Sequence, residues 1–186
     1  NQPIHALIGT YRTEVPAYAS SIDGAVKGPL STPESYADFA QQCLEMGYRA
    51  FKIHTRMPPI PNTPNPKEDV AICASVREAV GPDMALMLDC FHWYTREDAY
   101  YIGKELEKLD FYCFEEPLPQ GLNYAGYDEL TRSLDIAVAG GEVLDSRASA
   151  RDRIVDRSFD IIQPDVTLCG GVAEVLFIAE MARLWS

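Results

Sequence analysis

The sequence lacks the features that mark several common protein classes. It contains no run of about 18 apolar residues, so it predicts no transmembrane helix. Its first residues, NQPIHALIGTYR, have neither the basic nor the apolar region of a signal peptide. No G-x-G-x-x-G and no Walker pattern is present, which argues against a bound dinucleotide or nucleoside triphosphate.

Basic residues and paired cysteines are also scarce. Sixteen Lys and Arg stand against 28 Asp and Glu, and the net charge of −12 disfavours nucleic acid and anionic membranes as partners. The cysteines are odd in number and scattered without a C-x-x-C, which argues against a disulfide framework and against zinc. We expect five reduced packing residues in a cytoplasmic protein: Cys43, Cys73, Cys90, Cys113 and Cys169.

What is present is an alternation of short apolar and longer amphipathic segments. The 186 residues, 47% of them hydrophobic, suit one globular domain. We expect strands at 15–20, 48–54, 84–89, 111–116, 135–142 and 159–165. Helices are expected at 31–47, 66–80, 95–109, 124–133, 146–156 and 172–185. Ser31 and Glu34 have the spacing of a capping box, and Gly47 suits the end of that helix.

The expected strands are continuous apolar runs, which is typical of a parallel sheet covered on both faces. An α/β fold of this kind is either an open doubly wound sheet or a (β/α)8 TIM-type barrel. The first strand lacks the glycine-rich turn of a doubly wound nucleotide binder, which favours the barrel. A barrel needs eight units, so residues 1–186 are expected to form its first six strand-helix units.

Acidic residues close four consecutive expected strands: Asp89, Glu115, Glu142 and Asp165. In a barrel the carboxyl ends of the strands meet on the face that carries the active site. Three converging carboxylates repel one another, and a divalent cation relieves the repulsion. Oxygen ligands favour Mg²⁺, held by Asp89, Glu115 and Glu142. The alternative for any one of them is a helix cap or a surface residue.

Two further polar residues lie within the second expected strand. Lys52 and His54 are two apart and therefore face the same side. A lysine there can neutralise an anion, and a histidine can act as acid or base near neutral pH. Glu116 faces away from Glu115 by strand alternation and suits an ion pair or a cap. His92 either reaches a substrate or packs.

Together these segments resemble the enolase superfamily, in its mandelate racemase/muconate lactonizing enzyme-like group. The resemblance rests on FKIH, MLDC, FEEPLP, AGGE and IIQPDVTLCGG, in this order and spacing. It implies the modified TIM barrel of that superfamily, with Asp89, Glu115 and Glu142 as Mg²⁺ ligands. It also implies that Asp165 pairs with a histidine on a seventh strand.

The sequence departs from the family pattern in three ways. The second strand has K-x-H where K-x-K is common, so the base on that face is either His54 or absent. Phe91 stands where the family often has Asn. The chain stops at Ser186, before strands seven and eight, and it has no N-terminal capping domain. We therefore expect a fragment of a longer protein.

The chemistry that the resemblance implies is removal of the proton α to a carboxylate. The expected activity is that of a Mg²⁺-dependent lyase that dehydrates an acid sugar to a 2-keto-3-deoxy acid. Lys52 would bind the substrate carboxylate or enediolate, His54 would exchange protons, and Asp165 would orient the absent histidine. The residues expected to contact the substrate are Tyr18, Ser20 and His92.

Two alternatives remain open at this point. The same scaffold carries racemases, epimerases and cycloisomerases, and a six-strand piece could instead be a noncatalytic barrel fragment. The expected partners are a small-molecule carboxylate and further copies of the chain in a homo-oligomer.

Overall fold

The six expected strands form one parallel sheet. A computed structural model of the chain describes residues 1–21, 30–120 and 124–185. The order across the sheet is the order along the chain, β1-β2-β3-β4-β5-β6. The strands are β1 (Ala19–Ser20), β2 (Ala50–His54), β3 (Ala85–Asp89), β4 (Cys113–Glu115), β5 (Ala137–Gly140) and β6 (Ile161–Ile162). A doubly wound sheet reverses its strand order at one point, and this sheet does not.

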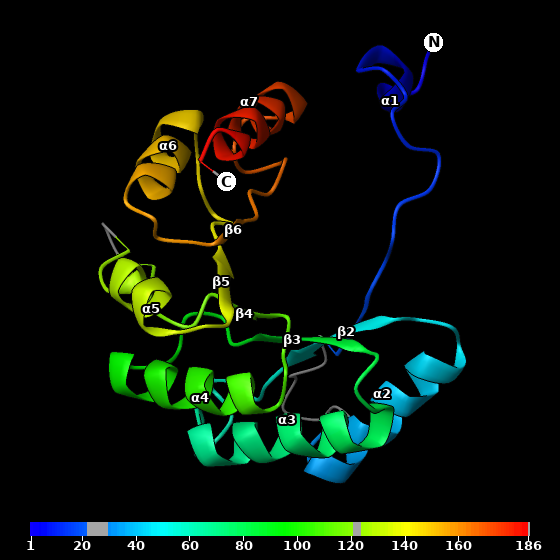
Figure 1. Cartoon of the computed structure of the whole chain (residues 1–186), viewed down its shortest axis with the longest axis vertical. Coiled ribbons are helices and arrows are strands. Elements are labelled where there is room, and N and C mark those ends of the chain that lie inside the picture. The colour runs from blue at the N-terminus through cyan, green and yellow to red at the C-terminus, as the bar shows by residue number, and fades with distance from the viewer. Residues whose placement is uncertain (22–29, 121–123, 186) are drawn as a thin grey trace.

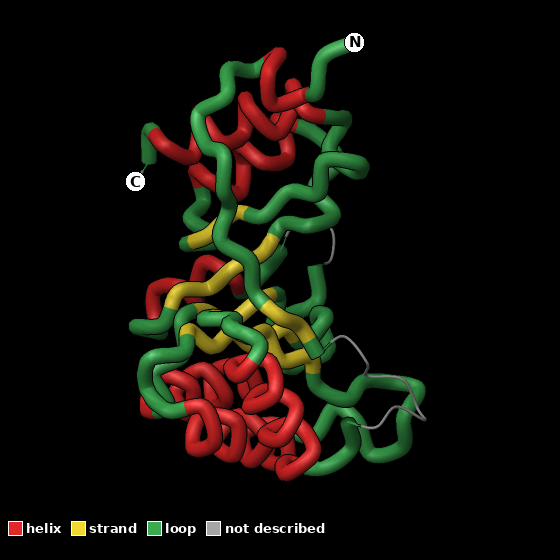
Figure 2. Tube along the Cα trace, turned by 90° about the vertical axis from the view of Figure 1, so that its right-hand side faces the viewer, coloured by secondary structure: helices red, strands yellow, loops and turns green. Residues whose placement is uncertain are grey.

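The described helices lie around the outside of this curved sheet, except for the short N-terminal one, which lies away from the sheet at the end of an extended arm. They are α1 (Ile4–Leu7), α2 (Pro33–Glu45), α3 (Pro66–Val80), α4 (Arg96–Lys108), α5 (Tyr127–Ser133), α6 (Arg147–Val155) and α7 (Val172–Arg183). In Figure 1, α2, α3 and α4 cover the lower face of the sheet, and α5, α6 and α7 continue the layer upward. Figure 2 shows the same layers from the side, with an extended arm leading into β1. This arrangement confirms the expected barrel-type fold. No helix within the described ranges is both long and apolar enough to cross a membrane.

Several element boundaries differ from the expected ones. The outer strands β1 and β6 have two residues each, because each has one neighbour and Pro16 and Pro164 cannot donate to a ladder. The first turn of α2 is capped by Thr32 with Ser35, and the expected capping box of Ser31 and Glu34 is wrong. The short helix α1 was not expected at all.

Side-chain alternation gives the sheet two different faces. Residues such as Phe51, Leu88 and Phe114 face the helices and are fully buried in the main hydrophobic core. Each such side chain contributes about 1.5–3 kcal/mol through its burial. The other face carries a smaller apolar cluster centred on Met87 and Cys113. All five cysteines are free and buried, which confirms the expected packing role.

A buried polar contact joins α3 to the loops that follow β2 and β3. The Tyr94 hydroxyl donates a 2.6 Å hydrogen bond to Asp69 Oδ2 and lies 3.5 Å from Thr55 Oγ1. Burial raises the pKa of Asp69 from its ordinary 3.8 to about 7, although the hydrogen bond from Tyr94 acts in the opposite direction. The Asp69 carboxyl group therefore stays protonated up to a higher pH in the folded chain than in the unfolded chain.

This contact predicts a pH dependence of stability. Between pH 4 and 7 only the folded state holds the Asp69 proton, so rising pH removes stability until about pH 7. Asp69→Asn keeps an acceptor for Tyr94 but cannot titrate. The stability of the wild type relative to this variant should fall by on the order of a few kcal/mol from pH 4 to pH 8. Urea unfolding across this range measures the difference, and a constant difference would contradict the prediction.

Candidate active site

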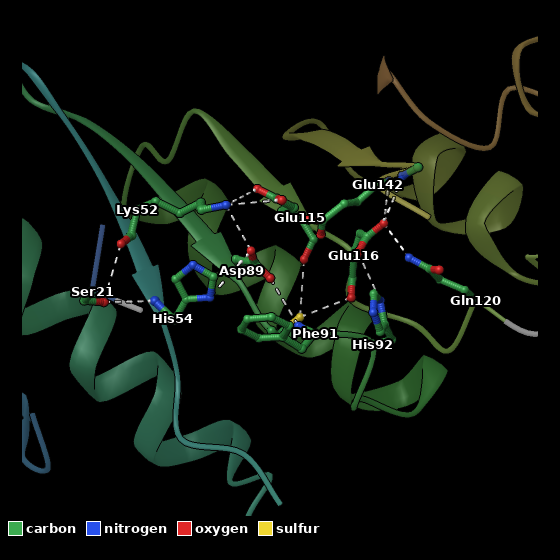
Figure 3. Close-up of polar contacts among 12 residues, drawn as sticks. Ser21, Lys52, His54, Asp89, Phe91, His92, Glu115, Glu116, Gln120 and Glu142 are labelled. Carbon is green, nitrogen blue, oxygen red and sulfur yellow. Dashed lines mark hydrogen bonds and ion pairs between the residues drawn. The ribbon is translucent and has the colours of Figure 1, made fainter. Parts of the chain in front are cut away.

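Three predicted site residues lie side by side at the carboxyl ends of neighbouring strands. The register pairs His54 with Asp89, Asp89 with Glu115, and Glu115 with Ala139. Residues in register on parallel strands share one face of the sheet, here the face away from the helices. All three side chains are buried and lie close together in Figure 3. The sheet itself therefore assembles this part of the site.

Lys52 lies two residues before His54 on the same face of β2, and its side chain extends to this row. Its Nζ is 3.0 Å from Asp89 Oδ2 and 3.1 Å from Glu115 Oε2. Burial on its own lowers the pKa of Lys52, but the charges of Asp89 and Glu115 outweigh burial and raise it. The lysine therefore stays protonated between the two carboxylates.

Two buried carboxylates share this one ammonium. Burial raises the pKa of Glu115, the charge of Asp89 raises it further, and Lys52 offsets only part of the effect. A second cation beside these oxygens would remove the remaining repulsion. Carboxylate oxygens that are short of positive charge are the donors that Mg²⁺ takes in proteins, so the pair fits the expected metal.

His54 completes the buried group. Its Nδ1 is 3.5 Å from Asp89 Oδ2, and its ring packs against Phe91 with the ring centroids 4.7 Å apart. Burial lowers the pKa of His54, which keeps the imidazole neutral and able to accept a proton at neutral pH. The His54 backbone N–H donates a 3.0 Å hydrogen bond to Ser21 Oγ. No sequence signal marks Ser21, although it holds this strand end in place.

Glu142 and Asp165 lie outside the row. β5 ends at Gly140 and β6 at Ile162, so neither acid closes its strand as expected. Glu142 is exposed, and Asp165 is half-buried and accepts hydrogen bonds from the backbone and hydroxyl of Thr167, which lower its pKa. Among the residues that the structure describes, no three His, Cys, Asp or Glu side chains are grouped to hold a metal ion.

The three expected substrate contacts surround the buried group. The Tyr18 ring is half-exposed, with its centroid 5.5 Å from Lys52 Nζ. Ser20 is in register with Lys52, and its buried Oγ has no hydrogen-bond partner among the described residues. On the opposite side, His92 Nδ1 lies 3.2 Å from Glu116 Oε2. Polar groups of the β1 segment and of the segment after β3 therefore lie on opposite sides of the buried group.

Comparison with known proteins identifies the family to which the chain belongs. A sequence model of the family described as "Enolase C-terminal domain-like" matches residues 35–186. The crystal structure of D-glucarate dehydratase from Agrobacterium tumefaciens complexed with magnesium superposes with a TM-score of 0.90 at 39% identity. That match covers 99% of this chain and 48% of the other.

Two curated relatives extend the comparison. Arabinonate dehydratase of Saccharolobus solfataricus is 29% identical over 98% of this chain and 46% of its own length. D-galactarolactone cycloisomerase of Agrobacterium fabrum is 34% identical over 95% of this chain and 44% of its own length. The chain therefore spans about half the length of the curated relatives it matches.

The shared ammonium predicts a large, pH-dependent loss of stability. Lys52→Met leaves two buried carboxylates without their cation and should cost about 3–5 kcal/mol at pH 8. The loss should shrink at pH 5, where the carboxylates can take up a proton. Urea unfolding with a chelator present measures both values.

A control separates this effect from that of an ordinary ion pair. Lys104 pairs with Glu107 on the partly exposed side of α4, so Lys104→Met should cost within about 1 kcal/mol. An equally small cost for Lys52→Met, or one that does not change with pH, would show that the buried group is not held by the lysine.

Proposed function

Because this chain belongs to the enolase C-terminal domain-like family, we propose that its protein is a Mg²⁺-dependent lyase. The reaction is the dehydration of an acid sugar to a 2-keto-3-deoxy acid. The observation that carries the proposal is Lys52 between the buried carboxylates of Asp89 and Glu115, with a neutral His54 beside them. The dehydratases among the similar proteins support this choice of reaction.

The proposed metal ligands are Asp89, Glu115 and Glu142. The first two are adjacent and short of positive charge, and Glu142 follows the next strand of the sheet. When bound, Mg²⁺ supplies Lewis-acid stabilisation of the negative charge that develops on the substrate carboxylate. The other roles belong to side chains of the protein.

Lys52 and His54 act on the substrate directly in this proposal. The Lys52 ammonium binds the substrate carboxylate and stabilises the enediolate as its charge grows. His54 Nδ1 faces Asp89, which leaves Nε2 to take the α proton. A general acid then protonates the β-hydroxyl, which leaves as water, and the resulting enol tautomerises to the 2-keto acid. Tyr18, Ser20 and His92 contact the sugar.

Asp165 has a supporting role in this scheme. We propose that it orients a histidine from a part of the protein outside these 186 residues. That histidine would serve the opposite face of the substrate.

We also propose that the protein is cytoplasmic and forms a homo-oligomer. The free, buried cysteines suit the reducing conditions of the cytoplasm.

A second candidate is an isomerase on the same scaffold. The cycloisomerase relative, at 34% identity, supports it. Semicarbazide detects the 2-keto product of dehydration across a panel of acid sugars, and epimerisation gives no signal. A third candidate, a noncatalytic barrel fragment, predicts no Mg²⁺ binding by calorimetry.

The metal assignment predicts the effect of one substitution in the intact protein. Glu142→Gln keeps the size of the side chain but removes a charged ligand. Mg²⁺-dependent formation of the 2-keto acid should be abolished, as measured by the semicarbazide assay. Retained turnover would remove Glu142 from the ligand set.

The role of His54 predicts a different result. His54→Asn should stop exchange of the α proton with solvent deuterium on one face of the substrate and leave the other face active. NMR of the recovered substrate in D₂O measures this exchange. Unchanged exchange on both faces would exclude His54 from the chemistry.

A further inference from the structure

Glu116 is a buried carboxylate that the proposed reaction does not use. It follows Glu115 directly, is 2% exposed, and has a backbone φ of 42°. This left-handed conformation is uncommon for a residue other than glycine, and such strain persists only where the surroundings enforce it. It turns the Glu116 side chain away from the Lys52 side of the site, toward the segment that follows β5 (Figure 3).

One oxygen of Glu116 collects three hydrogen bonds. Oε1 accepts from the backbone N–H of Gly141 at 2.9 Å and of Glu142 at 3.1 Å. It also accepts from Gln120 Nε2 at 2.5 Å. Hydrogen bonds to a charged acceptor are roughly twice as strong as neutral ones. Gly141 has a φ of 101°, which lets two successive N–H groups point at the same carboxylate.

The remaining polar atoms of Glu116 reach the segment after β3. Its Oε2 lies 3.2 Å from His92 Nδ1, and its carbonyl accepts a 2.7 Å hydrogen bond from the His92 backbone N–H. Its own N–H donates to the carbonyl of Ala139 in β5. A single residue thus connects the segments that leave three consecutive strands.

These contacts matter most for Glu142. The ladder between β4 and β5 ends with Glu115 and Ala139, so strand pairing with β4 does not reach Glu142. From the β6 side, the Asp165 N–H donates a 3.2 Å hydrogen bond to the Glu142 carbonyl. From the β4 side, Glu116 holds the Glu142 N–H.

We propose that Glu116 is the positioning residue for Glu142, and that its hydrogen bonds to Gly141 and Glu142 place this third carboxylate for Mg²⁺. The metal part of this inference rests on the proposed function. A purely structural Glu116 would affect overall stability and leave Mg²⁺ affinity unchanged in the folded chain.

The test compares three variants of the intact protein with the wild type. Glu116→Ala removes the acceptor, and Glu116→Gln keeps a neutral one. Asp69→Asn is the matched control, because Asp69 is equally buried at 2% exposure and lies outside the site. Amide hydrogen exchange of Gly141 and Glu142, measured by NMR with a chelator present, reports the hydrogen bonds without metal. Calorimetric titration with Mg²⁺ reports the affinity.

The positioning role predicts a specific pattern. Glu116→Ala should lose the protection of both amides and bind Mg²⁺ about 10–100-fold more weakly. Glu116→Gln should show smaller losses of both kinds, and Asp69→Asn should show neither. If Glu116→Ala does not fold, Glu116→Gln decides alone, because unchanged protection and affinity in that variant overturn the inference.

The other outcomes separate the inference from the proposed function. If the wild type binds Mg²⁺ and Glu116→Ala binds it equally well, the positioning role is wrong and the proposed function stands. If the wild type binds no Mg²⁺, the proposed metal site fails, and the positioning role fails with it. Loss of amide protection in Glu116→Ala would then still show that the hydrogen bonds exist.

Discussion

The site depends on the repulsion between two buried carboxylates that share a single ammonium group. Asp89 and Glu115 lie at neighbouring strand ends, and the ammonium of Lys52 forms an ion pair with each of them. Burial makes each unbalanced charge expensive, so the group attracts either protons or a further cation. Burial and the charge of Asp89 raise the pKa of Glu115, whereas burial lowers the pKa of His54 against the opposing effect of Asp89. The proposed roles of this group as a site for a hard cation and of His54 as a neutral base rest on these electrostatics.

The parallel sheet makes such a group possible. Its register carries His54, Asp89 and Glu115 into one row on the same face of the sheet. Met87 and Cys113 lie on the same face beneath this row, and Met87 is in register with Lys52. The helices on the outer face supply the hydrophobic burial that holds the strands in place. Stability and chemistry are therefore divided between the two faces of the sheet.

The sequence predicts the parts of this structure that depend on short-range patterns. The alternation of short apolar and longer amphipathic segments predicts α3 at its observed bounds, and side-chain alternation places Lys52 and His54 on one face. It does not predict where β5 and β6 stop, because this depends on the left-handed turn at Gly141 and on Pro164. Asp89 and Glu115 are brought together as expected, whereas Glu142 lies beyond the end of β5 and its role as a metal ligand remains a prediction.

Long-range hydrogen bonds are the part that no local pattern reveals. Ser21 holds the end of β2, and Glu116 binds the backbone of a segment 25 residues further along the chain. Strand alternation indicates that Glu116 faces away from Glu115, but its partners depend on how the segments after β3 and β5 pack beside it. In physical terms, periodicity shows which face a side chain occupies, and only the folded chain shows what it meets there.

A crystal structure of the chain soaked with Mn²⁺, which takes the same oxygen ligands as Mg²⁺, tests the central claim most directly. Anomalous scattering locates the metal independently of the protein atoms. The account predicts one strong peak coordinated by Asp89, Glu115 and Glu142. A peak elsewhere, or no peak near Lys52 at saturating Mn²⁺, would contradict it.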